Sequence, residues 1–291
     1  MLQFPQSVDR DFVNISTSAR KSPIKFFLLT FALSIPFWML GALISFQPLP
    51  GLPVSALMFL CPMMAALILV YAENRIAGVT ALLKRSFDYK RIKSKIWYLP
   101  IIFLMPGVMV LSYALMRLLD LPLANPHFSA LASLALFVAF FIAALGEELG
   151  WSGYAIDPMQ DRTNALAASI FLGLVWAGLH IIPFVEAGRS PAWIAWQCFG
   201  MVVSRVLLVW LYNNTGKSVF ATSFFHAMVN VSFFLFPIYG SYYDPRITGL
   251  ILAFVATIVV ALWGPHTLAR FGNAWQGRAF SITHVARSKD D

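Results

Sequence analysis

Two adjacent carboxylates interrupt an otherwise apolar stretch of this chain. Glu147 and Glu148 lie in the segment ALGEELGWSGY, which follows a long run of Ala, Leu and Phe. Neighbouring helical positions point in directions about 100° apart, so one carboxylate can face a cavity while the other binds an adjacent helix. Two acids in a low dielectric resist double ionisation, and a carboxylate that accepts a proton near neutral pH is a candidate general base. The alternative is a pair at a helix end that simply reaches cytoplasmic water.

Two further pairs of polar residues have the spacing of one helical turn. Trp176 precedes His180 by four positions, and His226 precedes Asn230 by four, so each pair projects onto one helix face. A lone buried histidine is more often a packing residue, but ionisable side chains inside an apolar helix are costly and usually functional. With the diglutamate, these residues could activate water and stabilise charge on a carbonyl oxygen. Two His and two Glu would also suit zinc, although the chain has no HExxH motif.

The composition indicates which elements must carry these residues. Hydrophobic residues make up 59% of the chain and charged residues 12%, which excludes both a soluble globule and a disordered chain. Apolar runs long enough to cross a bilayer predict an all-α, polytopic transmembrane helix bundle. Eight spans are expected, near residues 26–46, 52–72, 97–118, 128–158, 164–183, 191–213, 217–236 and 246–264.

The distribution of Lys and Arg predicts how this bundle lies in its membrane. With both termini in the cytoplasm, the inner segments hold 17 bases and the outer segments hold three, which are Arg117, Arg189 and Arg246. This asymmetry favours an N-in, C-in protein of the bacterial inner (plasma) membrane. Cytoplasmic tails are expected at 1–25 and 265–291, with the bundle over 26–264. The clustered bases suit anionic lipid and require no nucleic acid.

The cytoplasmic loop expected over residues 73–96 has a pattern of its own. In the segment 78–92, apolar residues recur at helical spacing and the bases fall mostly on the other side. This pattern is typical of an interfacial helix on the inner leaflet. A surface that recruits substrate is the alternative.

The three motifs resemble those of the CAAX-protease and bacteriocin-processing family (CPBP, also called Abi) of intramembrane glutamate endopeptidases, which includes type II CAAX prenyl endopeptidase. The family pattern is EExxxR, then an aromatic residue four positions before His, then His four positions before Asn. The chain has these motifs in that order within residues 140–235, the predicted protease core. The resemblance implies that Glu147 activates water with help from His180, without a metal or other cofactor. It also implies that His226 and Asn230 stabilise the oxyanion, with Trp176 as the motif's aromatic residue.

One position departs from the family pattern. Ser152 stands where the motif has arginine, which makes a weak protease or a non-catalytic relative an alternative. Arg205, in the predicted span 191–213, lies at comparable depth, and we hypothesise that it pairs with Glu148. The alternative, which is the more usual behaviour, is that Arg205 snorkels toward the inner headgroups.

These observations favour an endopeptidase that cleaves a peptide or a membrane-protein substrate in a cavity open toward the cytoplasm. Two other classes stay open. Glu147 and Glu148 could be the ion sites of a proton-coupled transporter, although no inverted repeat is evident. The chain could also be a scaffold or immunity protein that keeps the protease fold. Neither the substrate nor the oligomeric state follows from the sequence.

Overall fold

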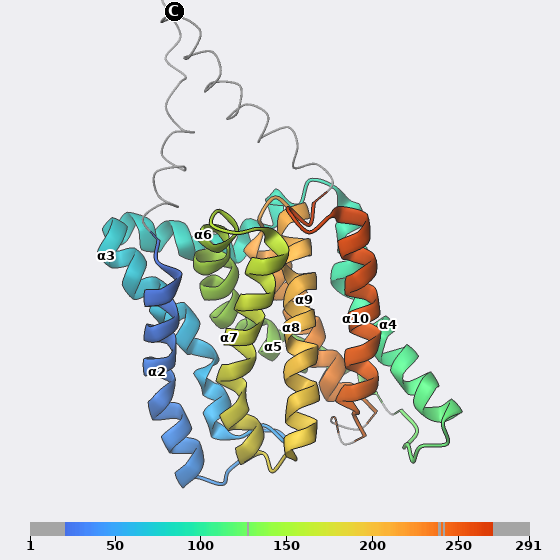
Figure 1. Cartoon of the computed structure of the whole chain (residues 1–291). Helices are drawn as coiled ribbons and strands as arrows, with labels where there is room; N and C mark the ends of the chain where they lie inside the picture. The colour runs from blue at the N-terminus through green and yellow to red at the C-terminus, as the bar shows by residue number, and fades with distance from the viewer. Residues whose placement is uncertain (1–20, 127, 238–239, 241, 270–291) are drawn as a thin grey trace, which may run out of the picture.

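The computed structural model describes residues 21–126, 128–237, 240 and 242–269, and every regular element in these ranges is a helix (Figure 1). In chain order the elements are α2 (Pro23–Leu43), η1 (Val54–Leu60), α3 (Cys61–Lys84), η2 (Arg85–Arg91), η3 (Lys95–Trp97), α4 (Tyr98–Leu118), α5 (Ala130–Gly150), η4 (Trp151–Ala155), α6 (Ile156–Gln160), α7 (Ala165–Glu186), α8 (Pro191–Asn214), α9 (Val219–Leu235) and α10 (Pro245–Trp263). The predicted tails lie outside the described residues, except for residues 21–25 and 265–269.

The long apolar helices confirm the all-α polytopic bundle. Within the described residues, seven helical segments are long and apolar enough to cross a bilayer, and α9 is shorter. The 17 residues of α9 extend about 25 Å at 1.5 Å per residue, less than the roughly 30 Å of a hydrocarbon core. This helix begins after its Ser218 cap and ends where Phe236 becomes extended. Each predicted span therefore matches a helical segment, but the one near 217–236 is a short helix.

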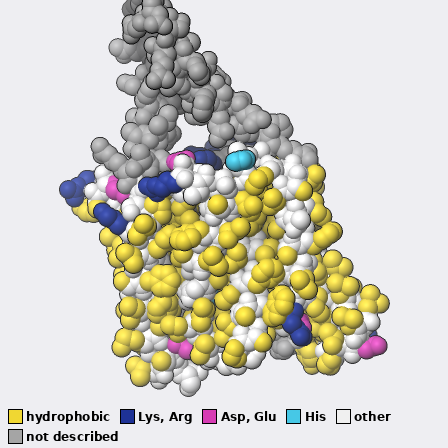
Figure 2. Space-filling model, in the orientation of Figure 1, with side chains coloured by type: hydrophobic (Ala, Val, Ile, Leu, Met, Phe, Trp, Pro, Cys, Tyr) yellow, Lys and Arg dark blue, Asp and Glu magenta, His cyan; other side chains and the backbone are white. Residues whose placement is uncertain are grey.

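Lysine and arginine side chains gather at one end of the bundle, which we call the basic end. Figure 2, in the orientation of Figure 1, shows them at the end where α6 lies. The opposite or distal end carries the connection between α2 and η1 and the connection between α7 and α8. This asymmetry is the basis of the predicted N-in, C-in orientation, which stays a prediction.

Helix α3 changes direction at Arg75, where the backbone leaves helical geometry with φ 53° and ψ −150°. Its second half then runs across the basic end of the bundle (Figure 1). The predicted interfacial helix over 78–92 is thus the last part of α3 followed by η2. Phe87 there is 69% exposed beside exposed bases such as Lys90, as the predicted contact with a membrane surface requires.

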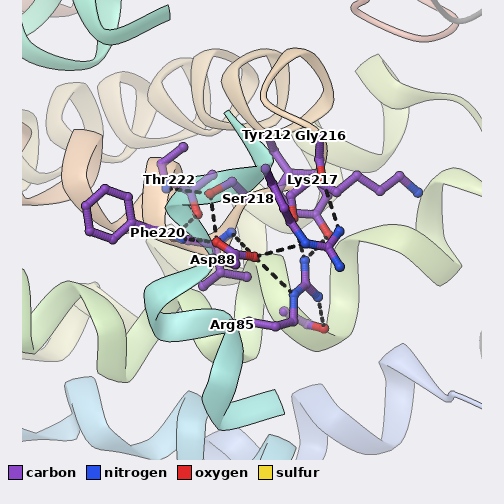
Figure 3. Close-up of polar contacts among 12 residues, drawn as sticks. Arg85, Asp88, Tyr212, Gly216, Lys217, Ser218, Phe220 and Thr222 are labelled. Atoms are coloured by element: carbon purple, nitrogen blue, oxygen red, sulfur yellow. Dashed lines mark hydrogen bonds and ion pairs between the residues drawn. The ribbon is translucent and has the colours of Figure 1, made fainter. Parts of the chain in front are cut away.

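Asp88 of η2 caps the start of α9 (Figure 3). Its carboxylate accepts hydrogen bonds from the Ser218 hydroxyl at 2.7 Å, the Phe220 amide at 3.0 Å and the Val219 amide at 3.3 Å. These amides belong to the first turn of a helix, where N–H groups have no partner within the helix itself. The loop at the basic end therefore fixes where α9 begins.

Arg85 closes the same cluster and connects it to η4 and α8 (Figure 3). Its guanidinium donates to the Gly153 carbonyl at 2.9 Å, the Tyr212 hydroxyl at 2.8 Å and the Lys217 carbonyl at 2.7 Å. Gly153 follows the diglutamate by only a few residues. One side chain of the basic end thus contacts η4 and α8, two segments that carry candidate site residues, and also the connection that leads into α9.

Close backbone approach brings α5 against α3. A Cβ added at Gly150 would lie 2.5 Å from the Pro62 carbonyl oxygen, a distance that no real Cβ tolerates. Gly173 of α7 is equally restricted, because a Cβ there would lie 2.9 Å from the Val202 Cα of α8. Glycine at these two contacts lets the helices pack closely around the diglutamate, as small residues do in membrane proteins.

Candidate active site

The diglutamate lies in the last turn of α5, inside the protein. The side chain of Glu148 is fully buried, and Glu147 is 6% exposed. The helix continues past them as the π-helical segment η4 and then as α6. The alternative of a pair that reaches water at a helix end is therefore wrong. A π-helical turn beside functional residues is a recurrent feature of helices.

Glu148 is held by three side chains from three helices. Arg205 Nη1 of α8 lies 2.9 Å from Oε1 and 3.0 Å from Oε2, and both side chains are fully buried. His226 Nδ1 of α9 lies 3.1 Å from Oε1, and the Ser152 hydroxyl donates to Oε2. The hypothesised Arg205–Glu148 pair is therefore present, and the snorkelling alternative is wrong because the guanidinium turns inward.

Arg205 also contacts the aromatic residue of the second motif. Its Cζ lies 4.4 Å from the centre of the Trp176 ring, a cation–π geometry. Ser152 stands where the family motif has arginine, and it donates a hydrogen bond to Glu148. The positive charge beside Glu148 comes instead from Arg205 of α8. The charge on Glu148 is thus balanced although EExxxR is incomplete.

Glu147 binds two indoles and faces the second histidine. Its Oε2 accepts from Trp176 Nε1 at 2.6 Å and from Trp151 Nε1 at 3.3 Å. Its Oε1 lies 3.8 Å from His226 Nε2. Trp151 was not among the predicted site residues. Its signal in the sequence is its position one helical turn after Glu147, which places both on one helix face.

His180 has a hydrogen bond that decides its tautomer. Its Nδ1 lies 2.9 Å from the Trp176 carbonyl oxygen, and because a carbonyl only accepts, Nδ1 carries the proton. In the neutral ring, Nε2 is then left with a lone pair that can accept a proton. The His180 and Trp176 rings lie edge to face, with centres 5.6 Å apart.

A cavity of about 430 Å³ brings the four predicted catalytic residues together: its wall includes Glu147, His180, His226 and Asn230. Trp176 also lines it, whereas Glu148, Ser152 and Arg205 lie behind this wall. The rest of the lining is largely apolar and includes Met58, Phe59, Met105, Met109, Phe140, Phe184, Val229 and Phe233. The site is thus a few polar groups in an apolar chamber, as ligand pockets commonly are.

The cavity extends from these residues to the distal end of the bundle. Its lining there includes Pro48 to Pro53 in the connection between α2 and η1, together with Arg189 and Trp193. At the basic end the bundle is filled by buried rings, Trp151, Tyr154 and Tyr212 among them. We expected a cavity open toward the cytoplasm as well as an N-in, C-in protein. The cavity lies away from the basic end, and both expectations stay predictions.

The described residues include no group of three or more His, Cys, Asp or Glu side chains placed to hold a metal ion. Glu148, one of the four candidate zinc ligands, is engaged by Arg205, His226 and Ser152. Metal dependence is addressed by the chelation experiment below.

Comparison with known proteins adds to this geometry. Residues 129–232 match the family of type II CAAX prenyl endopeptidases described as Rce1-like. A relative, the CAAX prenyl protease 2 of Methanococcus maripaludis, is 27% identical over 240 residues, covering 74% of this chain and 85% of the relative. In this region the chain is similar to the Rce1-like type II CAAX prenyl endopeptidases.

This similarity supports a membrane endopeptidase in general. The matched region begins just before α5 and ends inside α9. It therefore contains every residue that the motifs singled out, and also Arg205, which the family pattern does not include. The three motifs and the cavity wall meet within this one matched region.

Proposed function

We propose that this protein is an intramembrane endopeptidase that hydrolyses a peptide bond with a water molecule activated by Glu147 and His180. The observation that carries the proposal is that Glu147, His180, His226 and Asn230, from three helices, line one cavity. Each position matches a family motif, and each side chain has a chemical use there. The fold and the family match support a membrane endopeptidase. The roles of the four side chains in hydrolysis are what we propose in addition.

Glu147 is the candidate general base. Two indole N–H groups fix its Oε2, which orients the carboxylate and leaves Oε1 toward the cavity. His180 offers the lone pair of Nε2 from the same wall. A water molecule between these two groups would lose a proton as it attacks the scissile carbonyl, and the base would then return that proton to the leaving amine.

His226 and Asn230 are the candidate oxyanion donors. They lie one helical turn apart on α9, and both line the cavity. The hydrogen bond to Glu148 uses the Nδ1–H group of His226, so Nε2 can donate as well only when the imidazole is charged. A preorganised donor pair of this kind stabilises the negative charge that develops on the carbonyl oxygen.

Glu148 therefore has a different task from its neighbour. Arg205, Ser152 and His226 occupy its two oxygens, so it is a positioning residue for His226 and not a base. The two carboxylates have separate roles because successive helical positions face different neighbours.

The substrate class is suggested by the relative, which is named a CAAX prenyl protease. A CAAX motif is a C-terminal sequence whose cysteine carries an isoprenoid chain. The apolar lining of the cavity suits a hydrophobic peptide segment, with or without such a chain. A lipid-borne peptide is thus the first candidate to test.

The direct test is cleavage by the purified protein in detergent micelles. The probes are a farnesylated CAAX peptide and its unmodified counterpart, and mass spectrometry of the products reports the cleaved bond. We expect cleavage, its loss in His180→Ala with the melting temperature retained, and full activity after exhaustive chelation. Unchanged cleavage in the variant contradicts the mechanism, and loss on chelation that zinc restores contradicts the metal-free version. Folded protein that cleaves no peptide supports the scaffold alternative, and ion-dependent uptake into proteoliposomes supports the transporter.

Cysteine labelling tests where the cavity opens. After Cys61→Ser and Cys198→Ser remove the chain's two cysteines, single cysteines are placed at exposed Pro48, beside the cavity at the distal end, or at exposed Lys93 at the basic end. The distribution of bases predicts that a membrane-impermeable maleimide labels Pro48→Cys in intact cells. Lys93→Cys is expected to react only after permeabilisation. The reverse pattern would contradict the N-in, C-in orientation.

A further inference from the structure

We propose that residues 74–96 form a docking surface for the anionic headgroups of a lipid bilayer, and that these headgroups stabilise the start of α9. The docking surface lies at the basic end of the bundle, away from the cavity. The inference rests on the proposed function and adds a form of regulation to it. It stands on the charge of this segment, on its exposed apolar side chains and on its hydrogen bonds to the connection between α8 and α9.

Positive charge is concentrated in the docking surface. Residues 74–96 contain seven lysines and arginines and a single acid, Asp88. Like charges this close together repel one another. The phosphates of an anionic leaflet reduce this repulsion, and they attract each lysine or arginine that lies near them. The bases whose side chains are exposed are Arg75, Lys84, Lys90, Arg91, Lys93 and Lys95.

Exposed apolar side chains make a bilayer the partner that fits this surface. The second half of α3 runs across the basic end (Figure 1), where Ile76 and Leu83 are exposed. Phe87 and Tyr89 of η2 are exposed as well. Apolar side chains interleaved with bases are typical of segments that lie among lipid headgroups. An acidic protein segment would pair with the bases but would leave these apolar side chains in water.

The other face of η2 is bound to the connection between α8 and α9. The Asp88 carboxylate accepts from the Ser218 hydroxyl and from two backbone amides in the first turn of α9 (Figure 3). Arg91 Nη1 donates to the Gly216 carbonyl at 3.1 Å. Gly216 has φ +67°, and a Cβ there would lie 2.8 Å from the Arg91 carbonyl oxygen, so this close contact requires glycine. One short segment thus joins the basic surface to the start of α9.

The same segment reaches the candidate active site through α9 and η4. His226 lies eight residues after Ser218, which is about 12 Å along the helix at 1.5 Å per residue. Arg85 of η2 donates to the Gly153 carbonyl of η4 at 2.9 Å, and η4 follows directly after α5, the helix of the diglutamate. Segment η2 therefore holds the two parts of the chain that meet where His226 contacts Glu148.

Repulsion among the bases and the cap on α9 oppose each other. Repulsion favours separation of η2 from the bundle, which would leave the first N–H groups of α9 without the Asp88 carboxylate. Anionic phosphates lower the cost of holding the bases together, so they shift the population toward the docked arrangement. We therefore expect anionic lipid to order the start of α9 and, through His226, to raise the rate of cleavage.

Hydrogen exchange measures this ordering without requiring cleavage. The protein is placed in nanodiscs of phosphatidylcholine, with or without phosphatidylglycerol, and mass spectrometry follows the fragment that covers residues 216–226. With phosphatidylglycerol we expect exchange there to be at least about five-fold slower, the lower end of typical coupling between two sites. Molar salt is expected to remove the difference, because it screens exposed charges.

Variants separate the surface from the cap. Lys90→Gln/Lys93→Gln is expected to lose most of the response to phosphatidylglycerol. Arg117→Gln/Arg246→Gln is the matched control, because it removes the same charge from exposed positions outside the docking surface, and it should respond like the parent. Asp88→Ala is expected to exchange fast in both lipids, since its cap on α9 is lost. Melting temperatures verify folding, and the comparison of lipids on the parent protein does not depend on this variant.

The outcomes decide two questions separately. Equal exchange of the parent in both lipids, or an undiminished response in Lys90→Gln/Lys93→Gln, would overturn the docking surface. Inorganic phosphate that slows exchange in phosphatidylcholine alone would also overturn it, because the ligand would then be free phosphate. A folded Asp88→Ala protein that still responds, or cleavage that is equally fast in both lipids, would refute the coupling to α9. Slower exchange with phosphatidylglycerol in a protein that cleaves no peptide in either lipid would uphold the docking surface and refute the proposed function.

Discussion

Glu147→Gln is expected to lower kcat for peptide cleavage by about 10²- to 10⁴-fold, the usual contribution of a positioned general base. Glutamine keeps an oxygen that can accept from the Trp176 and Trp151 indoles, which bind Oε2 in the structure. The substitution therefore preserves volume and most hydrogen bonds while it removes the proton acceptor. Substrate affinity is expected to change little, so the loss appears in kcat and not in KM.

The measurement is steady-state cleavage of the best peptide found, together with thermal unfolding in the same detergent. Glu73→Gln is the matched control, because Glu73 of α3 also accepts a hydrogen bond, from the Tyr154 hydroxyl at 2.7 Å, and does not line the cavity. It is expected to retain activity. If Glu147→Gln cleaves at the normal rate, or if Glu73→Gln loses as much, Glu147 is not the base.

The sequence predicted the membrane spans and the paired motif residues for different reasons. Long apolar runs define spans by length alone, so seven of the eight predicted spans match segments long enough to cross a bilayer, and the eighth matches the shorter α9. The pairs Trp176–His180 and His226–Asn230 were found because residues four apart share a helix face. Family order then suggested that the three helices meet, and the cavity wall shows that they do.

The details that the sequence did not reveal depend on packing between helices. The sequence left two orientations open for Arg205, pairing with Glu148 and snorkelling toward the headgroups, because depth along a helix says nothing about which way a side chain turns. Its direction is set by the buried Glu148 and by the Trp176 ring. The π-helical turn at Trp151–Ala155 and the break at Arg75 have no periodic signal either. The end at which the cavity lies depends on connections between helices, which hydropathy does not describe.

The distal position of the cavity links the orientation of the protein to its substrates. If the basic end faces the cytoplasm, a peptide reaches Glu147 from the other side of the membrane. If the labelling pattern is reversed, the same cavity receives peptides from the cytoplasm. In both cases Glu147 lies at the inner end of the cavity. Orientation thus decides which proteins are substrates.

Removing Arg205 is expected to have the largest effect on stability. Arg205→Met leaves Glu148 as a fully buried carboxylate whose charge is no longer balanced by an arginine. Breaking a buried ion pair from one side costs about 3–5 kcal/mol of unfolding free energy. Methionine fills a similar volume, so the loss reports charge and not a cavity. Unfolding by denaturing detergent measures it, with Arg246→Met, in a largely exposed pair with Asp244, as the control that should unfold like the parent.

The double variant Glu148→Gln/Arg205→Met separates stability from catalysis. It contains no unbalanced charge from this pair, so most of the lost stability is expected to return. Activity is expected to stay low, because the neutral amide that replaces the Glu148 carboxylate would no longer position His226 with a charge-assisted hydrogen bond. Recovery of stability and activity together would show that Glu148 does not act through His226. If neither single nor double variant changes stability, the buried pair contributes nothing to the fold, and its retention has another cause.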